Sequence, residues 1–137
     1  MGADMLGDQI SDLSGRRTAR RVVSVDSGFK VEVSFEDRGK LLGTEGGNIG
    51  TYWSTPRADG TLCGEGHGVF ATDDGEMVTW KGIGTGMFTG GRKLSYRGAL
   101  MYNTSSKKLA RLNEIVGVFE FEVDADGNTH SKTWEWK

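Results

Sequence analysis

The sequence predicts an all-β protein, a closed antiparallel eight-stranded meander barrel with one short helix between strands six and seven. Turn signals recur along the chain, and the segments between most of them are rich in Val, Thr, Phe, Tyr and Trp. Since no second set of helices is available to cover a flat sheet, a closed barrel is favoured because closure removes unpaired edges. A two-sheet sandwich is the alternative. The turn signals are Ser27-Gly28, Gly46-Gly47, Asp59-Gly60, Asp74-Gly75, Gly90-Gly91 and Asp126-Gly127.

The eight expected strands alternate with these turns, and the second and seventh show the clearest period of two. In the second, Phe29, Val31, Val33 and Phe35 alternate with polar residues, which predicts one buried and one solvated face. The helix is expected over 105–115, with Leu109 and Leu112 on its apolar side, lying across one end of the barrel. The expected strands cover residues 16–25, 29–43, 48–56, 61–72, 76–88, 92–104, 115–124 and 128–137.

Length, charge and cysteine content narrow the function classes. The chain of 137 residues fits one domain over 1–137, and whether 1–14 are loosely ordered is left open. The net charge is -2, whereas a nucleic-acid-binding protein is expected to carry an excess of basic residues. Neither a signal peptide nor an apolar run long enough for a membrane helix is present. The single Cys63 excludes an internal disulfide. We therefore expect a cytoplasmic protein with no nucleic-acid or membrane partner.

Two rows of alternating glycines flank the Asp74-Gly75 turn. A glycine inside a strand costs about 0.5–1 kcal/mol relative to alanine, so the rows need a compensating role. One explanation is curvature, with an aromatic ring of a neighbouring strand lying flat on the backbone. The other is space, because an eight-stranded barrel opens a ligand cavity only where side chains are removed. The rows are Gly64, Gly66, Gly68 and Gly82, Gly84, Gly86.

The loop at Asp74-Gly75 decides what faces these glycines. An even loop places Glu65 opposite Gly84 and His67 opposite Gly82. A three-residue loop over 73–75 pairs glycine with glycine and moves Glu65 and His67 to the face opposite Trp80. The sequence leaves both registers open.

The other hairpins carry their own register expectations. The same even parity at Gly90-Gly91 would set Gly84 opposite Arg97 and Trp80 opposite Met101. The first hairpin favours an odd loop with Val23 opposite Val31, and the last favours an even loop with Phe119 opposite Trp134. In the even register one face would combine the following residues: Glu65, His67, Trp80, Arg97 and Asn103.

Glu65, His67 and Arg97 are the candidate catalytic residues. Glu65 and His67 are two apart on one strand, so both point the same way, and a carboxylate, an imidazole and a guanidinium together suit proton transfer beside an anionic or carbonyl group. The alternative is that they are charged residues on the solvated outer face. Only two histidines occur and no metal-ligand spacing or phosphate loop is present, so we expect no metal and no cofactor.

Aromatic and glycine residues supply the candidate ligand-binding set. Aromatic rings on one face would line an apolar cavity and carry hydroxyl groups at fixed points. The alternative is that the rings are the barrel's core. The candidate ligand-binding residues are Trp53, Trp80, Tyr96, Tyr102, Asn103, Gly82 and Gly84.

The run GTLCGEGHGVFATDDGEMVTWKGIGTG, followed by KLSYRGALMY and VGVFEFEVDADGN, resembles a group of small uncharacterised bacterial proteins. The order of eight meandering strands with one helical overpass is similar to that of the allene oxide cyclase-like (calycin-like) barrels over most of the chain. This resemblance implies a lumen that holds an apolar or amphipathic small molecule, in some members isomerised or cyclised without a cofactor, and frequent homo-oligomers. No catalytic motif aligns, so the resemblance assigns no functional residue.

Three functions remain. The first is a ligand-binding barrel whose lumen holds one small, largely apolar molecule among the candidate residues. The second is a cofactor-independent isomerase or cyclase with Glu65 or His67 as general base and Arg97 stabilising negative charge. The third is an oligomeric interaction module with a packed barrel and no cavity.

Overall fold

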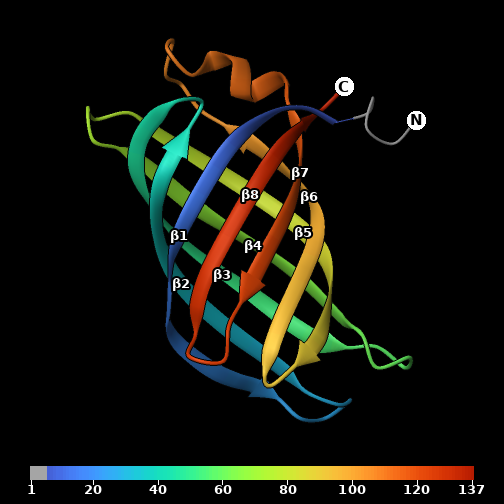
Figure 1. Cartoon of the computed structure of the whole chain (residues 1–137). Helices are drawn as coiled ribbons and strands as arrows, with labels where there is room; N and C mark the ends of the chain where they lie inside the picture. The colour runs from blue at the N-terminus through green and yellow to red at the C-terminus, as the bar shows by residue number, and fades with distance from the viewer. Residues whose placement is uncertain (1–5) are drawn as a thin grey trace.

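The protein is a closed barrel in the computed structural model, which describes residues 6–137. Each strand pairs antiparallel with the next, and β8 closes the barrel against β1 (Figure 1). This confirms the predicted meander barrel and excludes the sandwich. The strands are β1 Leu6–Ser24, β2 Lys30–Leu41, β3 Thr44–Pro56, β4 Leu62–Thr72, β5 Met77–Gly90, β6 Lys93–Asn103, β7 Val116–Val123 and β8 Asn128–Trp136.

Strand β1 is longer than the sequence indicates, with 19 residues that begin at Leu6. Residues 6–14 are therefore strand, and 1–5 lie outside the described residues. The extra length pairs with β8 from Leu6 to Arg16, whereas pairing with β2 continues to Ser24. The N-terminal part of β1, which pairs with β8 to close the barrel, thus has a sequence with no strand signal of its own.

The short helix predicted between strands six and seven is present as a 3-10 turn, η1 (Ala110–Glu114), which is shorter than the predicted range 105–115. Polar side chains explain the difference. Asn113 accepts the Thr104 backbone N–H at 2.8 Å through Oδ1 and donates to the Thr104 carbonyl at 2.9 Å, and Ser106 Oγ accepts the Leu109 N–H at 3.2 Å. Such side-chain bonds compete with helical backbone bonds. The segment still lies across one end of the barrel, as expected (Figure 1).

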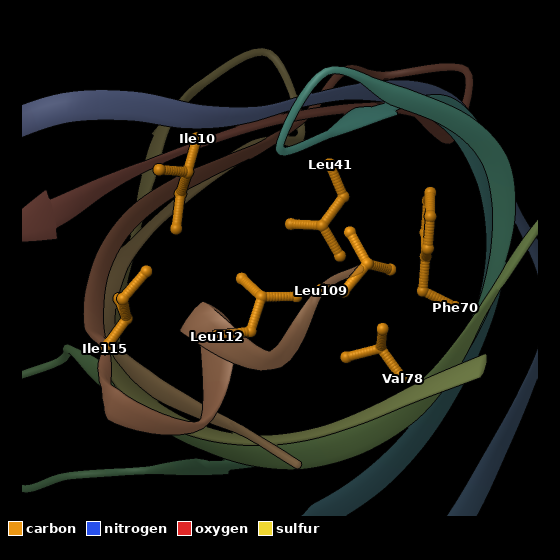
Figure 2. Close-up of a cluster of buried hydrophobic side chains, with 7 residues drawn as sticks. All are labelled: Ile10, Leu41, Phe70, Val78, Leu109, Leu112 and Ile115. Carbon is orange, nitrogen blue, oxygen red and sulfur yellow. The ribbon is translucent and has the colours of Figure 1, made fainter. Parts of the chain in front are cut away.

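This segment closes its end of the barrel with apolar side chains. Leu109 and Leu112 are 1% and 0% exposed and point toward the strands, as Figure 2 shows. A second apolar cluster fills the opposite end of the lumen. The first cluster is Ile10, Leu41, Phe70, Val78, Leu109, Leu112 and Ile115. The second is Val33, Phe35, Tyr52, Leu62, Tyr96, Phe121 and Val123.

The hairpin between β4 and β5 takes the three-residue loop. The Thr72 N–H donates to the Glu76 carbonyl at 2.8 Å, and Gly75 has a φ of +97°, a conformation that favours glycine. Glycine therefore faces glycine, in the pairs Gly64 with Gly84 and Gly66 with Gly82.

The register expected at Gly90-Gly91 is wrong. Gly84 faces Gly98, Trp80 faces Tyr102, and Arg97 faces Thr85. A bulge between Phe88 and Gly90 shifts the pairing by one residue.

The other two hairpins also differ from expectation. Ser24 faces Lys30, but a bulge then sets Val22, in place of Val23, opposite Val31. In the last hairpin Val118 faces Trp134, and Phe119 faces Thr133. The Asp124 side chain accepts the backbone N–H groups of residues 126 and 128, which fixes a three-residue turn.

Candidate functional site

The glycine rows accommodate aromatic rings that lie flat on the barrel wall. A Cβ atom at Gly86 would be 2.5 Å from the Tyr96 ring, and one at Gly68 would be 2.5 Å from the Trp80 ring. At Gly84 a Cβ would be 2.7 Å from the Arg97 carbonyl oxygen, so the strands themselves are too close for a side chain. Ring packing and close strand approach thus account for the glycines, and a cavity lies beside them.

Between the two apolar clusters the lumen contains a cavity of about 110 Å³. Its wall combines aromatic rings, the glycine backbone and a few polar groups. A cavity of about 150 Å³ in another protein holds benzene, so this one is close to the size of a single ring. The lining residues used below are Phe35, Asp37, Asn48, Tyr52, Gly82, Gly84, Trp80, Tyr96, Leu100, Tyr102, Phe119 and Ser131.

A chain of three polar side chains crosses the wall of this cavity. The Trp80 indole N–H donates to Asn48 Oδ1 at 2.7 Å, and Asn48 Nδ2 donates to Asp37 Oδ1 at 2.9 Å. Asp37 and Asn48 face each other on β2 and β3, while Trp80 reaches across from β5. The hydrogen bonds fix the orientation of the Asn48 amide, and with it the orientation of the carboxylate.

Asp37 is 3% exposed, and its second oxygen, Oδ2, has no hydrogen-bond partner within residues 6–137. Burial raises the pKa of Asp37 to about 6, and the hydrogen bond from Asn48 opposes part of that rise. Gly15 on β1 leaves the room for this residue, since a Cβ there would lie 2.5 Å from the Asp37 Cα. The site therefore holds a buried carboxyl group with one unused acceptor.

Three tyrosines line the same cavity, and burial raises the pKa of each phenol above its ordinary value. Tyr96 shares a hydrogen bond of 2.9 Å with Ser54 Oγ. Tyr52 and Tyr102 lie on β3 and β6. All three phenols remain protonated at neutral pH and are available as neutral hydrogen-bond groups.

The predicted ligand-binding residues divide between the two faces of the wall. Trp80, Tyr96, Tyr102, Gly82 and Gly84 line the cavity. Trp53 and Asn103 belong to the outer face, where the Trp53 indole N–H donates to Glu32 at 3.2 Å and Asn103 is exposed.

The three candidate catalytic residues also lie outside the lumen. Glu65 and His67 are exposed, and the His67 ring meets the edge of Trp53 at 5.2 Å between centroids. Glu65 borders the lumen cavity while its exposed side chain belongs to an outer groove shared with His67, Lys81 and Met101. The Arg97 side chain is 73% exposed, 4.0 Å from Glu120. They do not form a shared lumen site.

Asp37 and Asn48 were not identified from the sequence, although a signal was present. The alternation that buries Val33 and Phe35 continues to residue 37, so it places Asp37 on the apolar face of its strand. The sequence signal of this site is thus an acidic residue at a position that the period of two assigns to the buried face of the strand. Asn48 has no comparable signal, because its strand is polar and rich in glycine.

Neither a metal site nor a spanning helix was found in residues 6–137. No group of three or more His, Cys, Asp or Glu side chains is placed to hold a metal ion there. Over the same range, no helix has the length and apolarity needed to cross a membrane.

Comparison with known proteins identifies the fold. No family model matches the chain, and no curated protein matches it. A protein of unknown function from Clostridium acetobutylicum aligns with a TM-score of 0.82 at 13% identity, covering 95% of this chain and 97% of that one. A beta-barrel like protein from Acinetobacter baumannii gives 0.76 at 15% identity, covering 95% and 94%. An enzyme from Penicillium herquei gives 0.61 at 16% identity, covering 93% and 96%. At these identities the likeness shows the shared barrel.

Proposed function

We propose that this protein binds one small, largely apolar or amphipathic molecule in its lumen. The observation that supports this most directly is the polar chain from Trp80 through Asn48 to Asp37 on the wall of an apolar cavity. Ligand sites combine an apolar lining with a few convergent polar groups and often a perturbed pKa. A buried carboxyl group that served packing alone would be expected to have both oxygens satisfied.

The aromatic lining would hold the ligand's apolar body, and Asp37 would orient its polar group. The resemblance of the strand order to the allene oxide cyclase-like barrels agrees with a ligand held at this position. The cavity also counts against the third hypothesis, a fully packed interaction module.

Native mass spectrometry of the protein as purified, with a search for a co-purifying small molecule, is the first test. One bound molecule per chain is the expected result. A matched pair of variants then locates it. Leu100→Trp fills the cavity from its wall, whereas Met101→Trp adds the same side chain at the next residue, which is 64% exposed.

Leu100→Trp should lose the bound molecule and Met101→Trp should keep it. If the first variant fails to fold, Ser131→Leu fills the same cavity with a smaller increase in volume. A folded Leu100→Trp protein that retains the ligand at full occupancy would contradict lumen binding.

A second candidate function is a cofactor-independent isomerase or cyclase with Asp37, in place of Glu65 or His67, as the proton-transferring group. The buried carboxyl group favours this candidate, because its pKa of about 6 lies near neutral pH. The similar fold of the Penicillium herquei enzyme is compatible with it. Incubating the identified ligand with the protein in deuterium oxide should label the ligand if Asp37 transfers protons, and Asp37→Asn should abolish that label.

The homo-oligomer expected from the sequence stays a prediction. The outer groove that includes Ile83, Met101 and Val116 is apolar enough to test, since these side chains are 55%, 64% and 39% exposed. If two copies associate there, Met101→Glu should reduce the mass measured by light scattering. An unchanged oligomer mass would rule out this groove as the contact.

A further inference from the structure

The buried charge of Asp37 points to the class of ligand. Burial and the Asn48 hydrogen bond account for the shifted pKa of Asp37, and no Arg or Lys within residues 6–137 contributes to it. An ionised carboxylate in an apolar interior is costly unless it is paired. Above about pH 6 Asp37 therefore carries a negative charge that no cation within residues 6–137 pairs directly.

No charged group on the neighbouring strands pairs with Asp37. On β1, Gly15 faces Asp37. Arg17, two residues further along, faces Phe35 and acts on Tyr52 and Tyr96 at the other part of the cavity, and it does not contribute to the pKa of Asp37. On β3 the facing residue is Asn48, which is neutral. From across the lumen, β5 and β6 contribute Trp80 and Tyr102, whose phenol stays protonated because burial raises its pKa.

Aromatic faces surround the position next to the carboxylate. Phe35 is two residues from Asp37 on the same inner face of β2, and its ring centroid is 6.3 Å from that of Trp80. Phe35 is also 5.0 Å from Phe121 and 5.9 Å from Tyr52. The negative faces of such rings attract cations, and the attraction is largest where water is excluded.

We infer that the lumen takes a small organic cation, a protonated amine with a ring-sized apolar body, whose ammonium group donates to Asp37 Oδ2 while its body lies among the rings of Phe35 and Trp80. This inference rests on the proposed lumen binding and adds the chemical class of the ligand. The cation pairs with the buried charge, uses the unfilled acceptor and fits a cavity of about 110 Å³.

Three probes of nearly the same shape test it: benzylamine, benzyl alcohol and benzoate, titrated by calorimetry at about pH 7.5. Benzylamine should bind at least about tenfold more tightly than benzyl alcohol, because a charge-assisted hydrogen bond to a buried carboxylate is the stronger one. Benzoate should not bind. The Trp80 indole N–H signal in NMR spectra reports occupation of the lumen, and the Trp53 indole on the outer face is the internal control.

Asp37→Asn should remove the preference for the amine, whereas Glu36→Gln, at the neighbouring exposed carboxylate of the same strand, should leave it unchanged. The unmodified protein gives a second test that needs no variant. Benzylamine stays protonated at about pH 5, whereas Asp37 is then mostly neutral, so its affinity should fall about tenfold relative to about pH 7.5.

The possible results separate this inference from the function on which it rests. If benzyl alcohol or benzoate binds in the lumen as tightly as benzylamine, the lumen is a binding site but the cation inference is wrong. An amine preference that persists in folded Asp37→Asn would also overturn it. Failure of all three probes to bind would contradict both the inference and the ring-sized lumen site.

Discussion

Asp37 on the inner face of β2 and Glu65 on the outer face of β4 are both carboxylates in strands, yet their surroundings are opposite. Asp37 is 3% exposed, bonded to Asn48 and set among aromatic rings. Glu65 is exposed, on the surface beside His67. In the sequence Asp37 lies between Glu36 and Arg38, whereas Glu65 lies between two glycines. The difference teaches that the face of the barrel wall on which a residue falls, more than the residue type, decides whether a carboxylate borders water or a cavity.

The largest expected effect contrasts two neighbours on β4. Phe70 is 2% exposed and belongs to the apolar cluster under the end segment, whereas Val69 points outward and is 36% exposed. Phe70→Ala should lower the free energy of unfolding by about 3–5 kcal/mol because it leaves a cavity. Val69→Ala should lower it by about 1 kcal/mol or less. Chemical denaturation measures both, and similar losses would mean that the assigned faces are wrong.

Two glycines sharpen the same contrast. A Cβ at Gly15, on the inner face, would be 2.0 Å from the Glu36 carbonyl oxygen, whereas at Gly47, on the outer face, the nearest atom is 3.1 Å away on the flexible Arg38 side chain. Gly15→Ala should destabilise the protein by about 3 kcal/mol through overpacking, and Gly47→Ala by less than about 1 kcal/mol. Thermal unfolding of both variants checks this. A Gly15→Ala protein as stable as the parent would show that β1 and β2 are further apart than described.

The pH dependence of stability tests the buried carboxylate. The pKa of Asp37 is about 6 in the folded state and 3.8 in the unfolded reference, so between these values the folded protein binds more protons. Stability contributed by this group is therefore lost as pH rises from about 4 to about 6, and the loss levels off above that range. The total loss of unfolding free energy from this group is about 3 kcal/mol at most. Asp37→Asn should remove this dependence and be the more stable protein at about pH 7.5.

The difference in unfolding free energy between the parent and Asp37→Asn, measured across pH, isolates the contribution of Asp37. The other acidic groups contribute equally to both proteins, so their contributions cancel in this difference. Asp59 and Asp124 carry pKa values lowered by hydrogen bonds, so their contribution has the opposite sign and is lost as pH falls. A difference that does not change between about pH 4 and about pH 7.5 would mean that Asp37 is solvated.

The smallest effect is expected on the outer face. Glu65→Gln and His67→Ala should each change stability by less than about 0.5 kcal/mol, because both side chains are exposed, and neither should alter occupation of the lumen. Co-purification of the ligand with each variant is the measurement. Loss of ligand in either one, with the fold intact, would place the site on the outside of the barrel and reverse the assignment of the two faces.

The sequence by itself determined the class of fold. Turn residues at regular spacing and the alternation from Phe29 to Phe35 are local signals, because glycine at positive φ and a period of two act within a few residues. The same signals place Trp80 and the glycines on strands, and the register with glycine facing glycine was one of the two that they allowed.

The tertiary structure alone decided which residues meet. A bulge moves a register by one residue and turns every later side chain to the other face, as at Gly90-Gly91, where Arg97 faces Thr85 instead of Gly84. The link from Trp80 to Asn48 joins residues 32 apart in the chain. The lumen site depends on such contacts, because closing the barrel, more than any local pattern, brings β2, β3 and β5 around one cavity.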